Sequence, residues 1–409
     1  MNIKSDFPIF ATHPDLVYLD SASTTHKPDF VIDQTDHYIA NSYANIWRGS
    51  YPLAMESEDI YDASKAAAAR LISASADQII YTHSSTYAYN MLAYSLVESG
   101  ILTHWSSIIL SISEHHANLV IWQKLSQSHR FIIKMIGITV DGGLDYDDLV
   151  DQMDETVQVV SLTGASNVTG AITDIARVRQ IIGSDVLFAI DGSQLVPNRR
   201  VDVQALWVDV LIWTTHKMLG FTGLWIMYLN TKWMSRLTCP RVGGGVIEEV
   251  SSSTYTLQRW SITREPGTPN LISAASYLYA LQYFDSIGGY DWWETYEQEL
   301  IDYFMFKLEQ QSVIKLASKS VSEWQTSTPR DLAISCTQLW VFSFYLTDWS
   351  SVLKLGENLG QQGICIRTWG HCAHPLVEQL GHDQLGRLSL YIYNTKEDID
   401  QFFEAITKL

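Results

Sequence analysis

The chain has 409 residues, of which 46% are hydrophobic and 18% are charged, and its 27 basic and 45 acidic residues give a net charge of −18. A chain of this length is too long to fold around one small hydrophobic core, so two domains are expected. The negative charge disfavours binding to nucleic acids and anionic membranes, whose phosphates repel it. No apolar run of about 18 residues predicts a membrane span, and the first residues lack the pattern of a signal peptide.

Cysteine usage indicates a reducing environment. The four cysteines, Cys239, Cys336, Cys365 and Cys372, form no CxxC pair and no spacing typical of metal ligands. So few thiols in so long a chain favour a reducing cytoplasm over a disulfide framework. We therefore expect a cytoplasmic protein without a metal site.

The first two thirds of the chain alternate strand and helix patterns. The apolar run 78–82 predicts a strand, followed by a helix with Leu92 and Leu96 on one face. Residues 157–162 and 185–190 predict two buried strands, and such a helical crossover makes them parallel. The remaining pattern residues are the helix face Ile175, Val178 and Ile182, the helix end at Gly183, and further strands at 208–213 and 223–229. This alternation is typical of an α/β layered domain.

The last third has a different character. Residues 290–312 predict a long helix, and the chain ends on an amphipathic helix with Thr395 as its cap and Ile399 on its apolar face. We therefore predict a change of domain near residue 288. The expected organisation is a large domain of residues 21–287 and a small domain of residues 288–409, joined by the N-terminal segment 1–20.

Polar residues follow the predicted strands, at the edge where open α/β sheets bind ligands. Lys217 comes directly after the strand 208–213, where burial lowers the pKa of a lysine and makes its amine a nucleophile towards an aldehyde. Asp191 ends the strand 185–190, where a carboxylate can keep a pyridine nitrogen protonated. A solvated lysine at a strand end and a helix-capping aspartate are the alternatives for these two residues.

Two further features complete a candidate cofactor site. Residues 84–86 stand at a helix start, where hydroxyls and free N–H groups bind a phosphate or simply cap the helix. His115 and His116 follow the apolar run 107–112, where an imidazole can stack on a cofactor ring and shuttle protons. A surface pair, or a fragment of a metal site, is the alternative for the histidines. The order of these features, with Asn167 between them, is what one pyridoxal-phosphate (PLP) site built along one sheet requires.

Motifs along nearly the whole chain carry a family resemblance. Thr215-His-Lys217 is typical of the class V aminotransferase superfamily, fold type I of the PLP enzymes, and the chain resembles this superfamily. Arg367-Thr-Trp-Gly-His-Cys-Ala373, followed by Arg387, is similar to the group II cysteine desulfurases (SufS/CsdA-like). The other matching motifs are Tyr18-Leu-Asp-Ser-Ala22, Arg48-Gly49, Glu114-His-His-Ala-Asn118, Asp191-Gly-Ser-Gln194, Gly243-Gly-Gly245 and Gly267-Thr-Pro269. The resemblance implies a large domain with a mostly parallel seven-stranded sheet and a smaller α+β domain that carries the catalytic cysteine loop.

The resemblance also implies a role for each site residue. Lys217 would hold PLP as a Schiff base and move the substrate's α-proton, while His115 would stack on the pyridine ring and Asp191 would pair with its nitrogen. Arg387 would bind the substrate's α-carboxylate, with Asn167 beside it. The remaining cofactor contacts would come from Gln194 and Asn167 at the ring oxygen, from Ser85, Thr86, Thr214 and His216 at the phosphate, and from Thr268 at the phosphate of the neighbouring subunit in a homodimer.

Cys372 would be the nucleophile. Its thiolate would take sulfur from PLP-bound L-cysteine, leaving L-alanine and an enzyme persulfide that a sulfur-acceptor protein receives, as in iron–sulfur cluster assembly. His371 and His374 are the neighbours expected to lower the pKa of the thiol or to handle its proton. Without the flanking motif, a small buried hydrophobe is the alternative for Cys372, and the other three cysteines are interpreted as structural.

Some positions depart from the family pattern. Trp369-Gly370 stands before His371 where Gly-His is usual, so an indole next to the reactive loop would narrow the pocket or alter the docking of a sulfur acceptor. The other departures are Thr215, His83, Trp47 and the segment 261–266. The rival interpretations are another class V enzyme, such as a selenocysteine or cysteine sulfinate lyase, an epimerase or an aminotransferase, and a non-catalytic protein that kept the fold.

Overall fold

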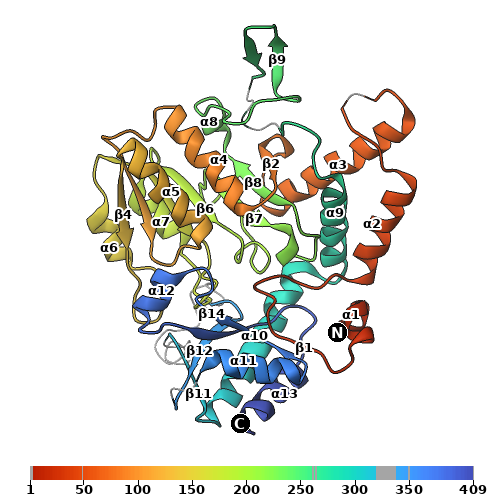
Figure 1. Cartoon of the computed structure of the whole chain (residues 1–409), viewed down its shortest axis with the longest axis vertical. Helices are drawn as coiled ribbons and strands as arrows, with labels where there is room; N and C mark the ends of the chain where they lie inside the picture. The colour runs from red at the N-terminus through yellow and green to blue at the C-terminus, as the bar shows by residue number, and fades with distance from the viewer. Residues whose placement is uncertain are drawn as a thin grey trace.

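A seven-stranded sheet forms the centre of the computed structural model, which describes residues 3–47, 49–259, 262, 265–318, 338–348 and 351–408 (Figure 1). Arg48, Cys336 and residues 261, 263 and 264 lie outside this part of the chain. The strand order is β2-β8-β7-β6-β5-β3-β4, and of these seven described strands β8 runs in the opposite direction to the other six. The strands are β2 (Ile79–Thr82), β3 (Ser107–Ser111), β4 (Ile132–Ile136), β5 (Val157–Thr163), β6 (Leu187–Asp191), β7 (Val210–Thr214) and β8 (Trp225–Leu229). The predicted mostly parallel α/β sheet is therefore confirmed.

Helices cover both faces of this sheet because successive side chains of each strand point to opposite sides. In β7, Leu211 and Trp213 join one apolar cluster and Ile212 joins the other. The helices of the first cluster are α2 (Asp29–Asn41), α3 (Pro52–Leu71), α6 (Tyr146–Gln152), α7 (Ile175–Ile182) and α9 (Leu271–Ser286), and those of the second are α4 (Ser85–Glu98), α5 (His116–His129) and the short α8 (Thr231–Met234). The predicted helix that stops at Gly183 is confirmed as α7.

A second sheet is built from the last third of the chain. It is antiparallel, with the order β11-β12-β15-β14, and packs with three helices around its own apolar cluster. The strands are β11 (Ile314–Leu316), β12 (Val341–Leu346), β14 (Arg367–Trp369) and β15 (Leu385–Ser389), and the helices are α10 (Gly289–Glu309), α11 (Val352–Gln361) and α13 (Lys396–Thr407). The short α12 (His374–Gln379) follows β14. The long helix predicted at 290–312 and the C-terminal helix after Thr395 are both confirmed.

The N-terminal segment contacts this second sheet. After α1 (Pro8–Thr12), β1 (Val17–Tyr18) pairs in parallel with β13 (Ile364–Cys365), and Val17 and Leu19 belong to the apolar cluster of the second sheet. These contacts support our proposal that residues 1–20 and 288–409 form one domain and residues 21–287 the other. Figure 1 also shows a hairpin of β9 (Ile247–Val250) and β10 (Tyr255–Leu257) that projects from the molecule. Within the described residues, each helix is too short or too polar for a membrane span.

We expect Trp213→Ala to lower the free energy of unfolding by about 3–5 kcal/mol, because a buried indole is lost and a cavity is left. Trp213 is fully buried in β7, and its Nε1 donates a hydrogen bond of 2.9 Å to the hydroxyl of Tyr277. Urea unfolding measures the change. The matched control is Trp207→Ala, which removes a side chain that is 65% exposed and is expected to cost less than about 0.5 kcal/mol. Equal losses for the two variants would contradict this account of the core.

Candidate active site

A cavity of about 190 Å³ lies at the carboxyl ends of β5, β6 and β7. This is the edge at which parallel α/β sheets bind ligands. Residues of the second sheet close the cavity from the other side, among them Arg367 and Arg387. The sequence-predicted residues that line it are Ser85, His115, Asn167, Asp191, Gln194, Thr214, His216, Lys217 and Arg387. The structure therefore brings together most of the predicted site.

Lys217 follows β7 in a short 3-10 turn and points into this cavity. Burial lowers the pKa of its ammonium to about 8, although the carboxylate of Asp191 opposes the shift. The turn is fixed through the carbonyl of His216, which accepts hydrogen bonds from the backbone N–H of Thr25 at 2.9 Å and from the hydroxyl of Thr24 at 3.1 Å. The structure thus favours a buried, reactive amine over a solvated lysine.

Asp191 and Gln194 lie on the turn after β6. One carboxylate oxygen of Asp191 accepts the backbone N–H of Ser193 at 2.9 Å, so the residue does cap a turn. The same side chain is buried and lines the cavity, so the cap and the cofactor contact are compatible. Gln194 is held by a hydrogen bond of 2.9 Å from its Nε2 to the carbonyl of Ala22.

His115 is the N-cap of α5. Its Nδ1 accepts the backbone N–H of Ala117 at 3.1 Å, which places the ring proton on Nε2. Burial lowers the pKa of His115 to about 4, so the ring is neutral at physiological pH. The preceding Glu114 fixes this corner of the site. Its buried carboxylate accepts hydrogen bonds from Ser111, Asn118 and the backbone N–H of Thr163, which joins β3, α5 and β5.

Buried polar atoms without partners mark one end of the cavity. Among the described residues, Thr214 Oγ1 and His216 Nδ1 are buried and have no hydrogen-bond partner. Leaving such groups unsatisfied costs about 1–3 kcal/mol each, so they indicate a bound polar group. Ser85 lies beside them in the first turn of the 14-residue helix α4, whose free N–H groups favour an anion. This donor set fits a phosphate.

Two predicted cofactor residues do not line this cavity. Thr86 is exposed and lines a separate surface hollow with Tyr87, so only Ser85 of this pair lines the cavity. Thr268 lines a wider hollow of about 740 Å³ together with Trp47, away from Lys217. Neither of these two hollows shares a lining residue with the cavity around Lys217.

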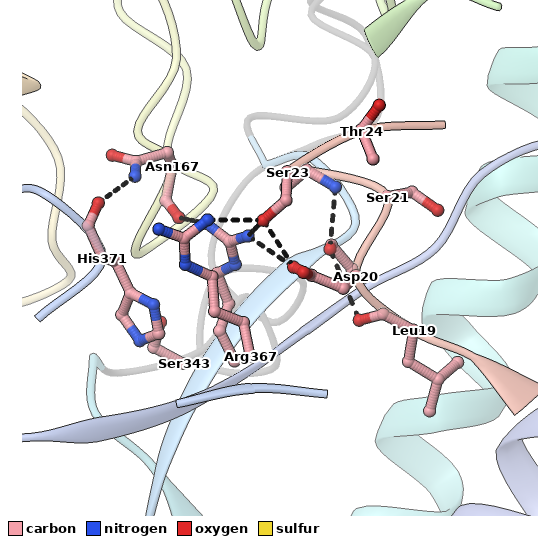
Figure 2. A network of polar contacts seen from close by, with 12 residues as sticks. Leu19, Asp20, Ser21, Ser23, Thr24, Asn167, Ser343, Arg367 and His371 are labelled. Carbon is pink, nitrogen blue, oxygen red and sulfur yellow. Dashed lines mark hydrogen bonds and ion pairs between the residues drawn. The ribbon is translucent and has the colours of Figure 1, made fainter. Parts of the chain in front are cut away.

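Two guanidinium groups from neighbouring strands meet at the opposite end of the cavity. Arg367 and Arg387 stand directly opposite each other in the β14–β15 pair. Arg387 is 1% exposed, forms an ion pair of 2.8 Å with Asp20, and donates to the carbonyl of Asn167 at 3.0 Å. Its Nε is buried and unpartnered among the described residues, so it can still bind a carboxylate. Asp20 and Ser23, which follow β1, both accept hydrogen bonds from Arg387, and Figure 2 shows them facing Arg367.

The loop that carries Cys372 lies against the large sheet. The carbonyl of His371 accepts a hydrogen bond of 2.7 Å from Asn167, and the carbonyl of Cys372 accepts the backbone N–H of His116 at 2.9 Å. Cys372 itself is partly buried and does not line the cavity. Two of its neighbours do: His371, which precedes it in sequence, and Arg367, whose Nη2 is 3.8 Å from its Sγ.

Neither flanking histidine is placed to supply a positive charge to the sulfur of Cys372, and their proton-handling role stays a prediction. Burial lowers the pKa of His371 to about 2, so this ring carries no charge that could stabilise a thiolate. His374 is exposed and shares a hydrogen bond of 3.0 Å with His116. Among the described residues, the cation beside the sulfur of Cys372 is Arg367. From the sequence, Arg367 was expected only as part of a matching motif. Its alignment with Arg387 depends on strand register, and no spacing in the sequence reveals that register.

The departures from the family pattern have different structural consequences. The hydroxyl of Thr215 donates to the carbonyls of Phe221 at 2.8 Å and Leu224 at 3.0 Å, so it fixes the loop after Lys217. His83 is exposed and does not line the cavity. Trp369 is 53% exposed next to the Cys372 loop.

Comparisons with known proteins identify the family. The model of the class-V aminotransferases matches residues 17–402. A cysteine desulfurase of Yersinia pseudotuberculosis is 32% identical, with 100% of this chain and 97% of that protein covered, and a probable cysteine desulfurase of Xylella fastidiosa is 30% identical, with 100% and 94% covered. The chain belongs to the class-V aminotransferase family and, within it, to the cysteine desulfurases. The predicted family is thus confirmed.

Solved structures agree with this assignment. The apo structure of a cysteine desulfurase from Thermococcus onnurineus has a TM-score of 0.88 at 25% identity and covers 100% of this chain and 98% of its own. The cysteine desulfurase CsdA from Escherichia coli, solved in an S-sulfonic acid form, has a TM-score of 0.87 at 26% identity, with 99% and 97% covered. The type I fold predicted from the sequence is therefore shared with experimental structures over the whole chain.

We expect Arg367→Gln to slow the alkylation of Cys372 by iodoacetamide at pH 7 by about tenfold, because the guanidinium Nη2, 3.8 Å from the sulfur, is lost as a charged hydrogen-bond donor. Mass spectrometry of the Cys372 peptide measures the rate. Arg367→Lys keeps the charge and should retain most of the reactivity. His374→Gln should leave the rate within about twofold, because its ring is paired with His116. A larger loss for His374→Gln than for Arg367→Gln would restore the histidine as the activating group.

Proposed function

We propose that this chain is a PLP-dependent cysteine desulfurase that converts L-cysteine to L-alanine and leaves a persulfide on Cys372. The observation that carries the proposal is one cavity that joins a buried amine at Lys217, a carboxylate at Asp191, unpartnered phosphate donors at Thr214 and His216, and an arginine at Arg387. The full-length similarity to cysteine desulfurases supports the choice of substrate.

The cavity lining supports a set of residues that would hold the cofactor. Thr214, His216 and the start of α4 would bind the phosphate, Asp191 would pair with the ring nitrogen, and His115 would lie against the ring. Bound PLP supplies an aldehyde that captures amino groups and a protonated ring that withdraws electrons from the α-carbon. The pKa of Lys217, lowered by burial to about 8, leaves part of its amine unprotonated at neutral pH, as both capture of the cofactor and removal of a proton require.

The chain's own groups would then position the substrate and receive its sulfur. Arg387 would bind the α-carboxylate, and Lys217 would take the α-proton. The thiolate of Cys372, stabilised by Arg367, would attack the sulfur of the substrate. An S–S bond forms as the C–S bond breaks, the electron pair of the broken bond stays with the carbon fragment, and protonation of that fragment gives alanine. The neutral ring of His115 carries a proton on Nε2 beside this reaction.

A second copy of the chain would complete the site. Thr268 lies in a wide hollow away from Lys217, where it could contact the phosphate bound by a partner. The segment 43–55 also carries Tyr43, Tyr51 and Met55, each about half exposed, which a second chain would cover in such a dimer. We propose a homodimer with shared sites, in the cytoplasm, that passes its persulfide to an acceptor protein, for example in iron–sulfur cluster assembly.

Incubation of the purified protein with PLP and L-cysteine should give alanine and a persulfide on Cys372, measured by amino-acid analysis and mass spectrometry. Cys372→Ser keeps the shape of the side chain but lacks the nucleophilic sulfur, so alanine formation should fall by at least about a hundredfold. Cys239→Ser, at a buried cysteine away from the site, is the matched control and should remain active. Alanine formation that does not depend on Cys372 would exclude the persulfide mechanism.

Uptake of PLP by the cofactor-free protein should accelerate as the pH rises through about 8 and then level off. The unprotonated amine of Lys217 is the reactive form, and burial lowers its pKa to about 8. A solvated lysine would instead keep gaining reactivity up to about pH 10. Stopped-flow absorbance measures the rate, and borohydride reduction followed by mass spectrometry locates the cofactor on Lys217. Lys217→Ala should bind PLP without becoming labelled. A rate that still rises between pH 9 and 10 would contradict the buried amine.

A further inference from the structure

The hydroxyl of Ser23 lies between the two arginines that end the active-site cavity. Its Oγ accepts a hydrogen bond of 2.6 Å from Arg367 and one of 2.9 Å from Arg387. It donates its own proton to Asp20 at 2.8 Å. A serine hydroxyl has one proton and two lone pairs, so all of its hydrogen-bonding capacity is used at this point. Figure 2 shows Ser23 beside Asp20 and the guanidinium group of Arg367.

The arginine pair needs such a bridge because its charges repel. Arg367 and Arg387 occupy directly opposite positions on β14 and β15, where like charges destabilise a strand pair. Asp20 forms an ion pair with Arg387 at 2.8 Å, and no ion pair of Arg367 occurs among the described residues. The shared Ser23 oxygen is therefore the polar contact that joins the second guanidinium to the first.

Each arginine lies next to a different group of the proposed reaction. Arg387 is the proposed site for the substrate's α-carboxylate, and Arg367 lies 3.8 Å from the sulfur of Cys372. A continuous line of contacts thus runs from Asp20 through Ser23 to the nucleophile. The segment of Ser23 belongs to neither strand, so its hydroxyl can hold both arginines in one geometry.

We propose that Ser23 is a positioning residue that couples the binding of the substrate's carboxylate by Arg387 to the stabilisation of the Cys372 thiolate by Arg367. This inference rests on the proposed desulfurase function and adds a residue to it. An incoming carboxylate takes up the unpartnered Nε of Arg387, while Asp20 and Ser23 hold its Nη2. Ser23 then keeps Arg367 and Asp20, so the arginine beside the nucleophile stays in place as the substrate binds.

The test compares Ser23→Ala with Ser23→Thr, which keeps the hydroxyl, and with Ser21→Ala as a matched control. Ser21 lies in the same segment, but its hydroxyl contacts Tyr393 at 2.8 Å and neither arginine. Two quantities are measured on the PLP-loaded protein. The first is KM and kcat for alanine formation from L-cysteine, and the second is the rate at which iodoacetamide alkylates Cys372 at pH 7 without L-cysteine.

Ser23→Ala should raise KM and slow the alkylation of Cys372, each by about three- to tenfold, because one hydrogen bond to each charged group is lost. Ser23→Thr should return both quantities to within about twofold of the wild type, and Ser21→Ala should leave both unchanged. In an Arg367→Gln background, Ser23→Ala should slow alkylation no further. A change in only one quantity, or equal effects from Ser21→Ala, would overturn the coupling.

Failure of the proposed function would be recognised separately. If the wild-type protein forms no alanine from L-cysteine, the desulfurase proposal fails. The alkylation rates of the same variants still decide whether Ser23 controls Arg367, since alkylation requires no turnover.

Discussion

Burial of the Lys217 amine is the constraint on which the rest of the site depends. An enclosed ammonium is costly, and burial lowers its pKa to about 8 while Asp191 opposes the shift. The same enclosure makes the surrounding histidines neutral, because burial lowers the pKa of His115 to about 4 and that of His216 to about 3. The imidazoles of the cavity therefore act as hydrogen-bonding and stacking groups. Besides the Lys217 ammonium, the cationic side chains of the cavity lining are the two arginines, where an anionic carboxylate and a thiolate would lie.

The sequence predicted the fold and one side of the site well, because both depend on local order along the chain. Strands such as β5 and β6 read as buried apolar runs, and parallel strands bring their carboxyl ends to one edge. Asp191 and Lys217 follow adjacent strands of the sheet, so their positions in sequence nearly determine their positions in space. The order of the motifs was sufficient for this half of the cavity.

The other half depends on contacts between distant segments, and the sequence could not supply them. Ser23 and Arg367 are 344 residues apart, and their contact requires the segment that follows β1 to lie across the β14–β15 pair. The same limitation applies to His371, which adjoins Cys372 in sequence but has its ring buried and uncharged, so sequence adjacency did not show which neighbour carries the charge. Thr86 is a further example: it adjoins Ser85 in sequence, but the helix turns its side chain towards a separate surface hollow. Adjacency in sequence is a weak guide to a site that two sheets build together.

The loop that carries the nucleophile illustrates how such a site holds its geometry. Trp369, His371 and Cys372 have φ angles of 108°, 48° and 58°, in a region where non-glycine residues cost about 1–3 kcal/mol each. Gly370 relieves the crowding, because a Cβ at this position would come within 2.6 Å of the ring of His374. The remaining strain is offset by hydrogen bonds to the loop from Asn167 and from the backbone of His116, both on the large-sheet side. The position of the sulfur is consequently determined by the sheet that carries Lys217, so the amine and the thiol share one rigid frame although 155 residues separate them in the sequence.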